Sequence, residues 1–155
     1  MRHLIDFGDL SRAEWEALYQ RTSAIIDHPA DFMDACRGRV AATLFFEPST
    51  RTNFSFQTAM LRVGGTVFGF ADPNSSSVAK GECLKDTIKM VSGYADVVVM
   101  RNPREGAAKA ASLYSDVPVI NAGDGGHMHP TQTTADLTTI TRLLGGVDGI
   151  SIGLC

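Results

Sequence analysis

The chain has 155 residues, which is enough for one domain of ordinary size. Hydrophobic residues make up 44% of it and charged residues 20%, so we expect a buried core and exclude a disordered chain. The formal net charge of −3 argues against a general nucleic-acid-binding protein, which carries a basic excess. No apolar run approaches the roughly 18 residues that span a bilayer. The charged start of the chain predicts no signal peptide, and three widely spaced cysteines indicate reduced thiols in a cytoplasmic protein.

The first predicted element is a helix that begins after Ser11 and ends near Asp27. Ser11 and Glu14 have the spacing of a capping box, and apolar residues then recur every three to four positions. Short apolar runs without alternation predict strands buried on both faces, at 40–46, 66–70, 97–100 and 117–121, and the beginning of another at 150–155. Helical patterns lie between and after these strands. The first of them ends at 63, and the others cover 84–91, 105–114 and 130–144. The Ser-rich segment 71–79 predicts a loop.

This alternation of strands and helices, with short connections, predicts an open three-layer α/β fold. Its central sheet is expected to be mostly parallel, with helices on both faces. Ligands of such folds bind at the carboxyl ends of the strands. Four loops lie there, at 47–52, 71–79, 101–104 and 122–130, and we expect the functional residues in them.

The first of these loops carries Ser49-Thr50-Arg51-Thr52 directly before a predicted helix. The N-terminus of a helix binds anions through its unpaired N–H groups, and hydroxyl and guanidinium donors suit a phosphate. The alternative interpretation is a helix cap with a surface arginine. Neither a Walker loop nor a dinucleotide-binding glycine motif occurs in the chain, so a nucleotide site has little support.

Two other loops contribute donors of different kinds. Arg101 follows a buried strand directly and is expected to point into the ligand crevice, where it would hold a phosphate or polarise a carbonyl group; the alternative is a solvated arginine. His129 precedes Pro130, which predicts an N-cap whose neutral imidazole can donate to a carbonyl oxygen, unless it serves as a cap alone. Gln132 lies one turn further on and could contact a small polar group. Glu47 is the only acid that we assign to this edge, where it would orient an arginine.

The loop at 71–79 adds hydroxyl groups, Ser76 and Ser77 among them, and is followed by Lys80. It is either a solvated mobile loop or a segment that closes over an anion, in its own site or in that of a neighbouring subunit. His127 and His129 have the spacing of a metal pair, but no third ligand is evident, so we expect no metal. Together the loops predict a site that binds a small phosphate-bearing electrophile and polarises its carbonyl group.

Four longer motifs carry these residues: FFEPSTRT at 45–52, SSVAKGE at 76–82, VMRNPREGAA at 99–108 and GDGGHMHPTQT at 123–133. In this order and spacing they resemble the catalytic chains of aspartate carbamoyltransferases, and the resemblance covers residues 4–153. It implies a transferase of pyrimidine biosynthesis that needs no cofactor. The reaction implied is transfer of the carbamoyl group from carbamoyl phosphate to the amine of L-aspartate, giving N-carbamoyl-L-aspartate and phosphate.

The resemblance also implies the roles of individual residues. It assigns the phosphate to Ser49, Thr50, Arg51, Thr52 and Arg101, the carbonyl oxygen to Thr52, Arg101 and His129, and the carbamoyl amide to Gln132. The catalytic residues that it implies are Arg51, Thr52, Arg101, His129 and Lys80. Lys80 and a loop serine, Ser76 with Ser77 as the alternative, would reach the site of a neighbouring subunit, which implies a homotrimer. Attached regulatory chains are left open, and neither nucleic acid nor a membrane is expected as a partner.

The resemblance further predicts the domain organisation. Residues 1–148 correspond to the carbamoyl-phosphate-binding domain and residues 149–155 to the start of the aspartate-binding domain, whose remainder is not in this chain. Chains of the family are about twice as long, so this chain by itself is expected only to bind carbamoyl phosphate. Asn53 and Asn102 stand where the family usually has arginine and histidine. The alternatives are half of an ornithine carbamoyltransferase, against which Lys80 argues, and a non-catalytic anion-binding domain.

Overall fold

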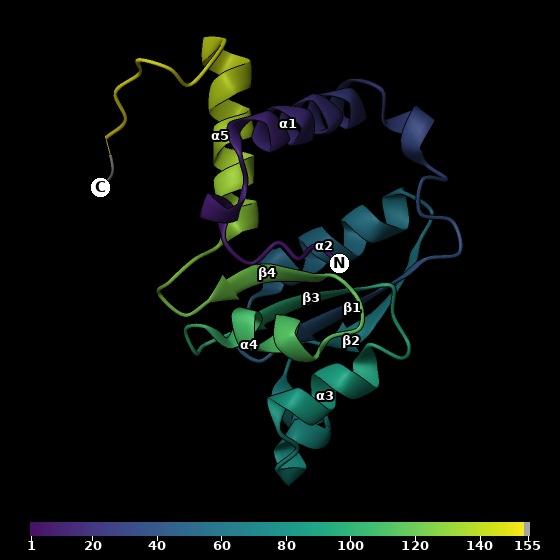
Figure 1. Cartoon of the computed structure of the whole chain (residues 1–155). Helices are drawn as coiled ribbons and strands as arrows, with labels where there is room; N and C mark the ends of the chain where they lie inside the picture. Colours follow the sequence, from purple (N-terminus) through teal and green to yellow (C-terminus); the bar gives the residue numbers. More distant parts are fainter. Residues whose placement is uncertain (154–155) are drawn as a thin grey trace.

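Four parallel strands form the central sheet of the computed structural model, which describes residues 1–153 (Figure 1). The strands are β1 (Val40–Phe45), β2 (Thr66–Phe70), β3 (Val97–Asn102) and β4 (Val119–Asp124), in the order β2-β1-β3-β4. The α-helices are α1 (Arg12–Asp27), α2 (Thr50–Arg62), α3 (Leu84–Val91), α4 (Ala107–Tyr114) and α5 (Pro130–Leu144). The predicted alternation of strands and helices is therefore confirmed.

The helices lie in two layers, one on each face of the sheet (Figure 1). The side chains of Leu44 and Met100 pack with α3 and α4, in a core that includes Ile88 and Ala108. Successive strand residues point to opposite faces, so Phe45 and Val99 turn the other way and pack with Phe56 of α2. α1 and α5 lie beyond α2 on that same side. The predicted three-layer arrangement is confirmed.

The strand order creates a crevice between β1 and β3. From β1 the chain passes through α2 to β2 on one side, and from β2 it passes through α3 to β3 on the other side of β1. Right-handed crossovers in opposite directions place their helices on opposite faces. The chain segments that leave the carboxyl ends of β1 and β3 therefore diverge, and the space between them is where ligands of open α/β sheets bind.

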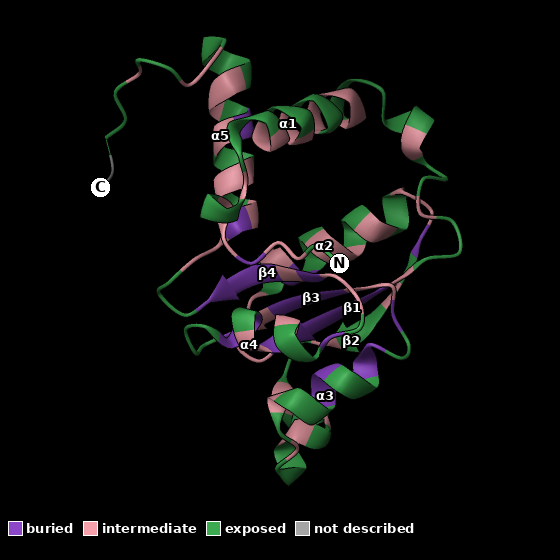
Figure 2. Cartoon of the chain, viewed as in Figure 1, coloured by how far each residue is buried: buried purple, intermediate pink, exposed green. Residues whose placement is uncertain are grey.

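Burial is concentrated in β1, β3 and β4, whereas the edge strand β2 is largely exposed (Figure 2). The other edge of the sheet, at β4, is covered by the N-terminal segment. Leu4 pairs there with Ile120, with hydrogen bonds of 2.9 Å from Leu4 N to Val119 O and 2.8 Å from Asn121 N to Leu4 O.

Several element boundaries differ from those predicted. β3 and β4 extend to Asn102 and Asp124, beyond the expected ends at 100 and 121. The segment expected to be a loop contains two short 3₁₀ helices, Pro73–Ser75 and Ser77–Lys80. Side chains stabilise both of them, because the carboxylate of Asp72 accepts the N–H of Asn74 at 2.9 Å and the Ser76 hydroxyl accepts that of Val78 at 3.3 Å.

The strand expected at 150–155 is not formed in its described part. Residues 150–153 have no regular secondary structure, and residues 154–155 lie outside the described residues. A strand needs a neighbouring strand to pair its backbone groups, and no strand of the described residues lies beside this stretch. Within residues 1–153, no helix combines the length and the apolar character needed to cross a membrane.

Candidate functional site

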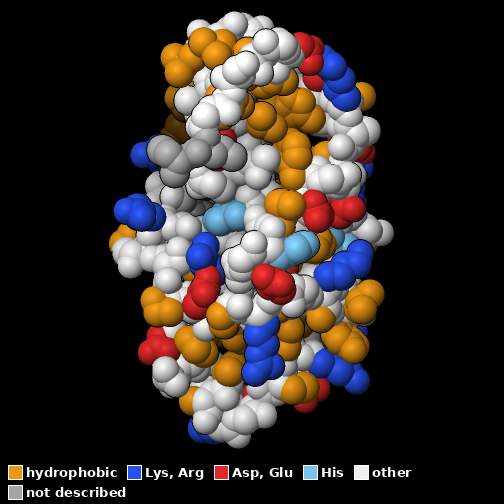
Figure 3. All heavy atoms as spheres, turned by 90° about the vertical axis from the view of Figure 1, so that its left-hand side faces the viewer, with side chains coloured by type: hydrophobic (Ala, Val, Ile, Leu, Met, Phe, Trp, Pro, Cys, Tyr) orange, Lys and Arg blue, Asp and Glu red, His pale blue; other side chains and the backbone are white. Residues whose placement is uncertain are grey.

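A cleft of about 900 Å³ lies at the carboxyl ends of β1 and β3, between the first turns of α2 and α5. It is lined by residues predicted to contact carbamoyl phosphate: Ser49, Thr50, Arg51, Thr52, Arg101, His129 and Gln132. Figure 3 views the carboxyl edge of the sheet and shows histidine side chains across the middle of this face, with both cationic and acidic side chains around them. The structure thus brings together residues from three loops that are far apart in the sequence.

The N-terminus of α2 provides the first wall of the cleft. Ser49 occupies the N-cap position, but its side chain makes no capping hydrogen bond. The Ser49 hydroxyl and the first N–H groups of α2 therefore keep their hydrogen-bonding capacity for a ligand, and the helix dipole adds positive potential there. Arg51 lines the cleft in the first turn of the same helix. This arrangement favours an anion site over a simple helix cap.

Asn53, which stands where the family usually has arginine, does not line the cleft. It is buried, and its Oδ1 accepts a hydrogen bond of 3.1 Å from Nε2 of Gln57. The same Gln57 nitrogen lies 3.3 Å from the hydroxyl of Thr43 on β1. Asn53 thus takes part in a polar contact between α2 and the sheet, so this departure leaves the residues of the cleft unchanged.

Arg101, at the end of β3, is held by two partners. Its Nε donates to Oε1 of Glu47 at 2.7 Å, and its Nη1 donates to the carbonyl oxygen of Ala122 at 3.2 Å. Both charged side chains are about three-quarters buried, so the ion pair is partly shielded from water. The prediction that Glu47 orients an arginine is confirmed. A rigid guanidinium in this position can hold a phosphate or a carbonyl oxygen.

His129 forms the N-cap of α5, as predicted from Pro130. Its Nδ1 accepts the N–H of Gln132 at 3.4 Å and lies 3.3 Å from the hydroxyl of Thr131. An accepting Nδ1 places the proton of the neutral ring on Nε2. Burial, together with the positive charge of Arg101, lowers the pKa of His129 below its usual value. His129 is therefore a neutral imidazole that can donate from Nε2.

Gln132 lies on the first turn of α5. Its Nε2 donates to Oδ1 of Asp136 at 2.9 Å, which fixes the orientation of the amide. The amide oxygen is then the group of Gln132 that a ligand can use, and an oxygen accepts hydrogen bonds from an NH₂ group.

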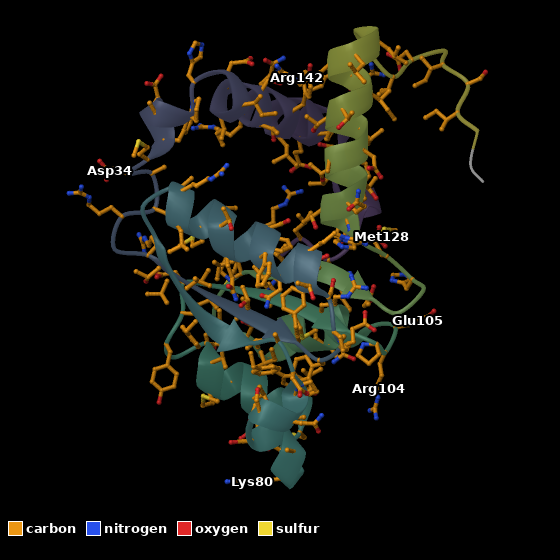
Figure 4. All side chains as sticks on the ribbon, turned by 180° about the vertical axis from the view of Figure 1, so that it is seen from behind. Asp34, Lys80, Arg104, Glu105, Met128 and Arg142 are labelled. Carbon is orange, nitrogen blue, oxygen red and sulfur yellow. The ribbon has the colours of Figure 1, made fainter. Side chains whose placement is uncertain are left out.

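Ser76 and Lys80 are not part of the cleft. Figure 4 shows Lys80 at the end of the molecule beyond α3, whereas Met128, the neighbour of His129, lies at the base of α5. The expectation that this lysine joins the cluster at the sheet edge is therefore wrong within one chain. Its action in the site of a neighbouring subunit stays a prediction. The Ser76 hydroxyl donates to Pro73 O at 2.8 Å, whereas Ser77 is exposed.

Sequence reasoning missed the buried acid Asp124, and the expectation that Glu47 is the only acid at this edge is wrong. Asp124 ends β4 with its side chain 1% exposed. The signal in the sequence was an acidic residue directly after an apolar strand, in a segment rich in glycine. Its neighbour His127 lies 3.3 Å from the Asp124 carboxylate. Within the described 153 residues, no three His, Cys, Asp or Glu side chains gather as metal ligands.

Comparison with known proteins gives the family of the chain. Residues 2–142 match the family model of the aspartate/ornithine carbamoyltransferase carbamoyl-P binding domain. The chain belongs to this family. It is 55% identical to the aspartate carbamoyltransferase catalytic subunit of Clostridium perfringens and 56% identical to that of Clostridium botulinum. In both comparisons the match covers 99% of this chain and 50% of the relative, so the chain spans about half the length of these relatives.

Solved structures agree with this assignment. The catalytic subunit of M. jannaschii aspartate transcarbamoylase superposes with a TM-score of 0.88 at 51% identity, over 97% of this chain and 50% of that one. The Trypanosoma cruzi enzyme in complex with carbamoyl aspartate and phosphate gives a TM-score of 0.91 at 41% identity, over 97% of this chain and 47% of that one. The resemblance to aspartate carbamoyltransferase catalytic chains is confirmed, and so is the α/β fold predicted from the alternation of strands and helices.

Proposed function

We propose that this chain is the carbamoyl-phosphate-binding half of an aspartate carbamoyltransferase. The whole enzyme would transfer the carbamoyl group of carbamoyl phosphate to the amine of L-aspartate, giving N-carbamoyl-L-aspartate and phosphate in the cytoplasm. The observation that carries this proposal is the cleft itself, in which the N-terminus of α2 faces anion-binding side chains while His129 presents a neutral donor. The relatives of the chain are aspartate carbamoyltransferases, which supports aspartate over ornithine as the second substrate.

The phosphate of the ligand would lie against the first turn of α2. Hydroxyl groups of Ser49, Thr50 and Thr52, the N–H groups of that turn and the guanidinium of Arg51 would donate to its oxygens. Arg101 would contact the phosphate from the opposite side, where Glu47 fixes its orientation. Charge-assisted hydrogen bonds of this kind are about twice as strong as neutral ones.

The carbamoyl group would then lie between β3 and α5. Thr52, Arg101 and Nε2 of His129 would donate to the carbonyl oxygen, and the amide oxygen of Gln132 would accept from the carbamoyl NH₂. When the aspartate amine attacks the carbonyl carbon, negative charge grows on that oxygen. Donors that are already in place stabilise this charge without reorganisation. The C–N bond forms, the bond from carbon to the phosphate oxygen breaks, and the amine gives a proton to the leaving phosphate.

The neighbouring-subunit residues belong to the same proposal. Lys80 is exposed at the end of its 3₁₀ helix, and among residues 1–153 no acidic side chain forms an ion pair with it. An exposed, unpaired cation remote from its own cleft suits an anion held by a second copy. Ser77 would serve as the loop serine if Ser76 keeps its backbone bonds. The assembly implied is a cyclic homotrimer.

Calorimetric titration of the chain with carbamoyl phosphate and with inorganic phosphate tests the binding function. We expect both ligands to bind and carbamoyl phosphate to bind more tightly, because it alone reaches His129 and Gln132. No heat and no rise in melting temperature at millimolar ligand would contradict the proposal. An assay of the longer polypeptide with L-aspartate and L-ornithine side by side decides the second substrate, and binding without turnover of either would favour a non-catalytic anion-binding domain.

A further inference from the structure

The carboxylate of Asp124 is held by several hydrogen bonds at the carboxyl edge of the sheet. Its Oδ1 accepts from the N–H of Met128 and from Nδ2 of Asn121, both at 3.1 Å. Its Oδ2 accepts from the N–H of Gly106 at 3.0 Å. With its side chain 1% exposed, the carboxylate depends on these donors instead of on water. None of these contacts involves the cleft directly, since Asp124 does not line it.

These bonds join two loops, and each loop has a cleft residue next to one of its ends. Met128 immediately precedes His129, and Gly106 is the N-cap of α4, at the end of the loop that begins after Asn102, the neighbour of Arg101. A backbone hydrogen bond of 2.9 Å from Gly125 N to Asn102 O joins the same two loops. Figure 4 shows Met128 and Glu105 on neighbouring loops at this end of the sheet. The only charged group in this junction that is buried is the carboxylate of Asp124.

Asn121 closes the arrangement from the strand side. Its Nδ2 donates to Ile5 O at 2.9 Å as well as to Asp124, and its Oδ1 accepts the N–H of Gly123 at 2.9 Å. The turn from 124 to 128 is therefore held by side chains of β4 at both ends, and a backbone bond of 3.2 Å from Asp124 N to Met128 O spans it. The position of His129 depends on this turn, because His129 is the next residue along the chain.

We propose that Asp124 is a positioning residue that places the His129 ring against the carbamoyl group, with no contact of its own to the ligand. This rests on the proposed function, because it concerns the same cleft. Through the N–H of Met128 the carboxylate acts on the His129 side of the cleft, where the carbamoyl group would lie. The phosphate half lies against α2, which follows β1 and has no bond to Asp124.

Replacing Asp124 with Asn tests this with little change in volume. The amide has one acceptor oxygen where the carboxylate has two, and its NH₂ group would face an N–H group. The amide oxygen takes the position with two donors, so the bond from Gly106 that joins the two loops is lost and His129 moves. We expect affinity for carbamoyl phosphate to fall about three- to tenfold, the effect of losing one neutral hydrogen bond. Affinity for inorganic phosphate should stay within twofold.

A double-mutant cycle separates positioning from a general structural role. His129→Ala alone should give the same loss of carbamoyl phosphate affinity, and adding Asp124→Asn to it should cause no further loss. Coupled residues show this non-additivity, whereas independent effects add. An Asp124→Asn effect of equal size with and without His129, or an equal loss of phosphate affinity, would overturn the proposal.

Asp96→Asn is the matched control. The Asp96 carboxylate also accepts a main-chain N–H, that of Val40 at 2.9 Å, but at the opposite end of the sheet. This variant should lower the melting temperature without changing the ratio of the two affinities. If Asp124→Asn does not fold, Asn121→Ala replaces it in the cycle, because the Asn121 amide holds the same carboxylate. The same ligand-specific, His129-dependent loss is then expected, and its absence would overturn the proposal.

The titrations distinguish the two levels of inference. A wild-type chain that binds neither ligand contradicts the proposed function. A wild-type chain that binds carbamoyl phosphate more tightly than phosphate, and that keeps this preference in Asp124→Asn, contradicts the positioning role alone.

Discussion

The guanidinium of Arg101 lies directly against the backbone of Gly123. A Cβ atom at position 123 would come within 2.8 Å of Arg101 Nη1, closer than real Cβ atoms approach other atoms. Gly123 also has a φ of +117°, a conformation that residues with a side chain rarely adopt. The absence of a side chain at this position on β4 is therefore what lets Arg101 reach the carbonyl oxygen of Ala122.

Gly123→Ala is accordingly expected to displace Arg101 and weaken binding of both phosphate and carbamoyl phosphate, by about tenfold for the loss of a charged hydrogen bond. Calorimetric titration measures this. Gly145→Ala is the control, because Gly145 also has a positive φ, +79°, but a Cβ there would meet no atom within 4 Å. It should destabilise the fold by about 1–2 kcal/mol and leave ligand affinity unchanged. Unchanged affinity in Gly123→Ala would mean that Arg101 does not contact the ligand.

Arg51→Ala should weaken binding of carbamoyl phosphate by about 1.5–3 kcal/mol, the range for a hydrogen bond to a charged group. The same helix provides a control, since Arg62 lies at the other end of α2 and outside the cleft. Arg62→Ala removes an equal charge and should leave the affinity nearly unchanged. Equal losses in the two variants would point to a general electrostatic effect instead of a phosphate contact at Arg51.

Stability should decrease in mild acid, partly through His3. Its Nδ1 accepts the N–H of Val119 at 3.1 Å, which requires an unprotonated nitrogen. Burial, the N-terminal amino group and Lys109 lower the pKa of His3 below 6.5 in the folded state. The unfolded chain therefore takes up the proton first as pH falls. The His3 contribution is complete above the unfolded value of about 6.5 and is lost as pH falls through the folded pKa.

Urea unfolding at pH 7.5 and pH 5.5 measures this contribution. His3→Asn keeps an acceptor near the position of Nδ1 but does not titrate, so its free energy of unfolding should change less between the two pH values than that of the wild type. His28→Asn, at the exposed end of α1, should behave like the wild type. An identical pH dependence for His3→Asn and the wild type would show that His3 does not contribute.

Mixing experiments on the longer polypeptide test the role of Lys80. Lys80→Ala and Arg51→Ala, each nearly inactive alone, should partly recover activity when their subunits are exchanged, because some mixed trimers then carry one intact site. Exchange between two preparations of Lys80→Ala is the control and should recover nothing. Flat activity despite demonstrated subunit exchange would show that Lys80 does not act across an interface.

The parts of the site that the sequence predicted are those with a local cause. Ser49 to Thr52 directly precede a helix, Pro130 marks His129 as an N-cap, and Arg101 follows a buried strand, so each position can be argued from its neighbours in the chain. The fold could be predicted in the same way, because short apolar runs typical of strands alternate along the chain with helical patterns.

The parts that were missed depend on distant partners. Asp124 reads as a turn residue among glycines, and its importance comes from the N–H of Gly106, eighteen positions away. β4 was predicted to end at 121 because a glycine-rich segment follows, yet the strand continues to Asp124, which pairs with Asn102 of β3, 22 positions earlier. The two 3₁₀ helices of 73–80 rest on side-chain caps that serine-rich composition does not specify.

The ion pair between Glu47 and Arg101 joins residues 54 positions apart, and β1 pairs with β3 only after α2, β2 and α3 have been looped out. Closing so long a loop is slow compared with forming a helix turn, because its entropic cost precedes any reward from contacts. The cleft therefore exists only in chains that have completed their long-range pairing. During refolding, recovery of ligand binding should lag behind the far-UV circular dichroism signal of the helices. The fraction of chains that bind ligand therefore measures fully folded molecules and does not include compact intermediates.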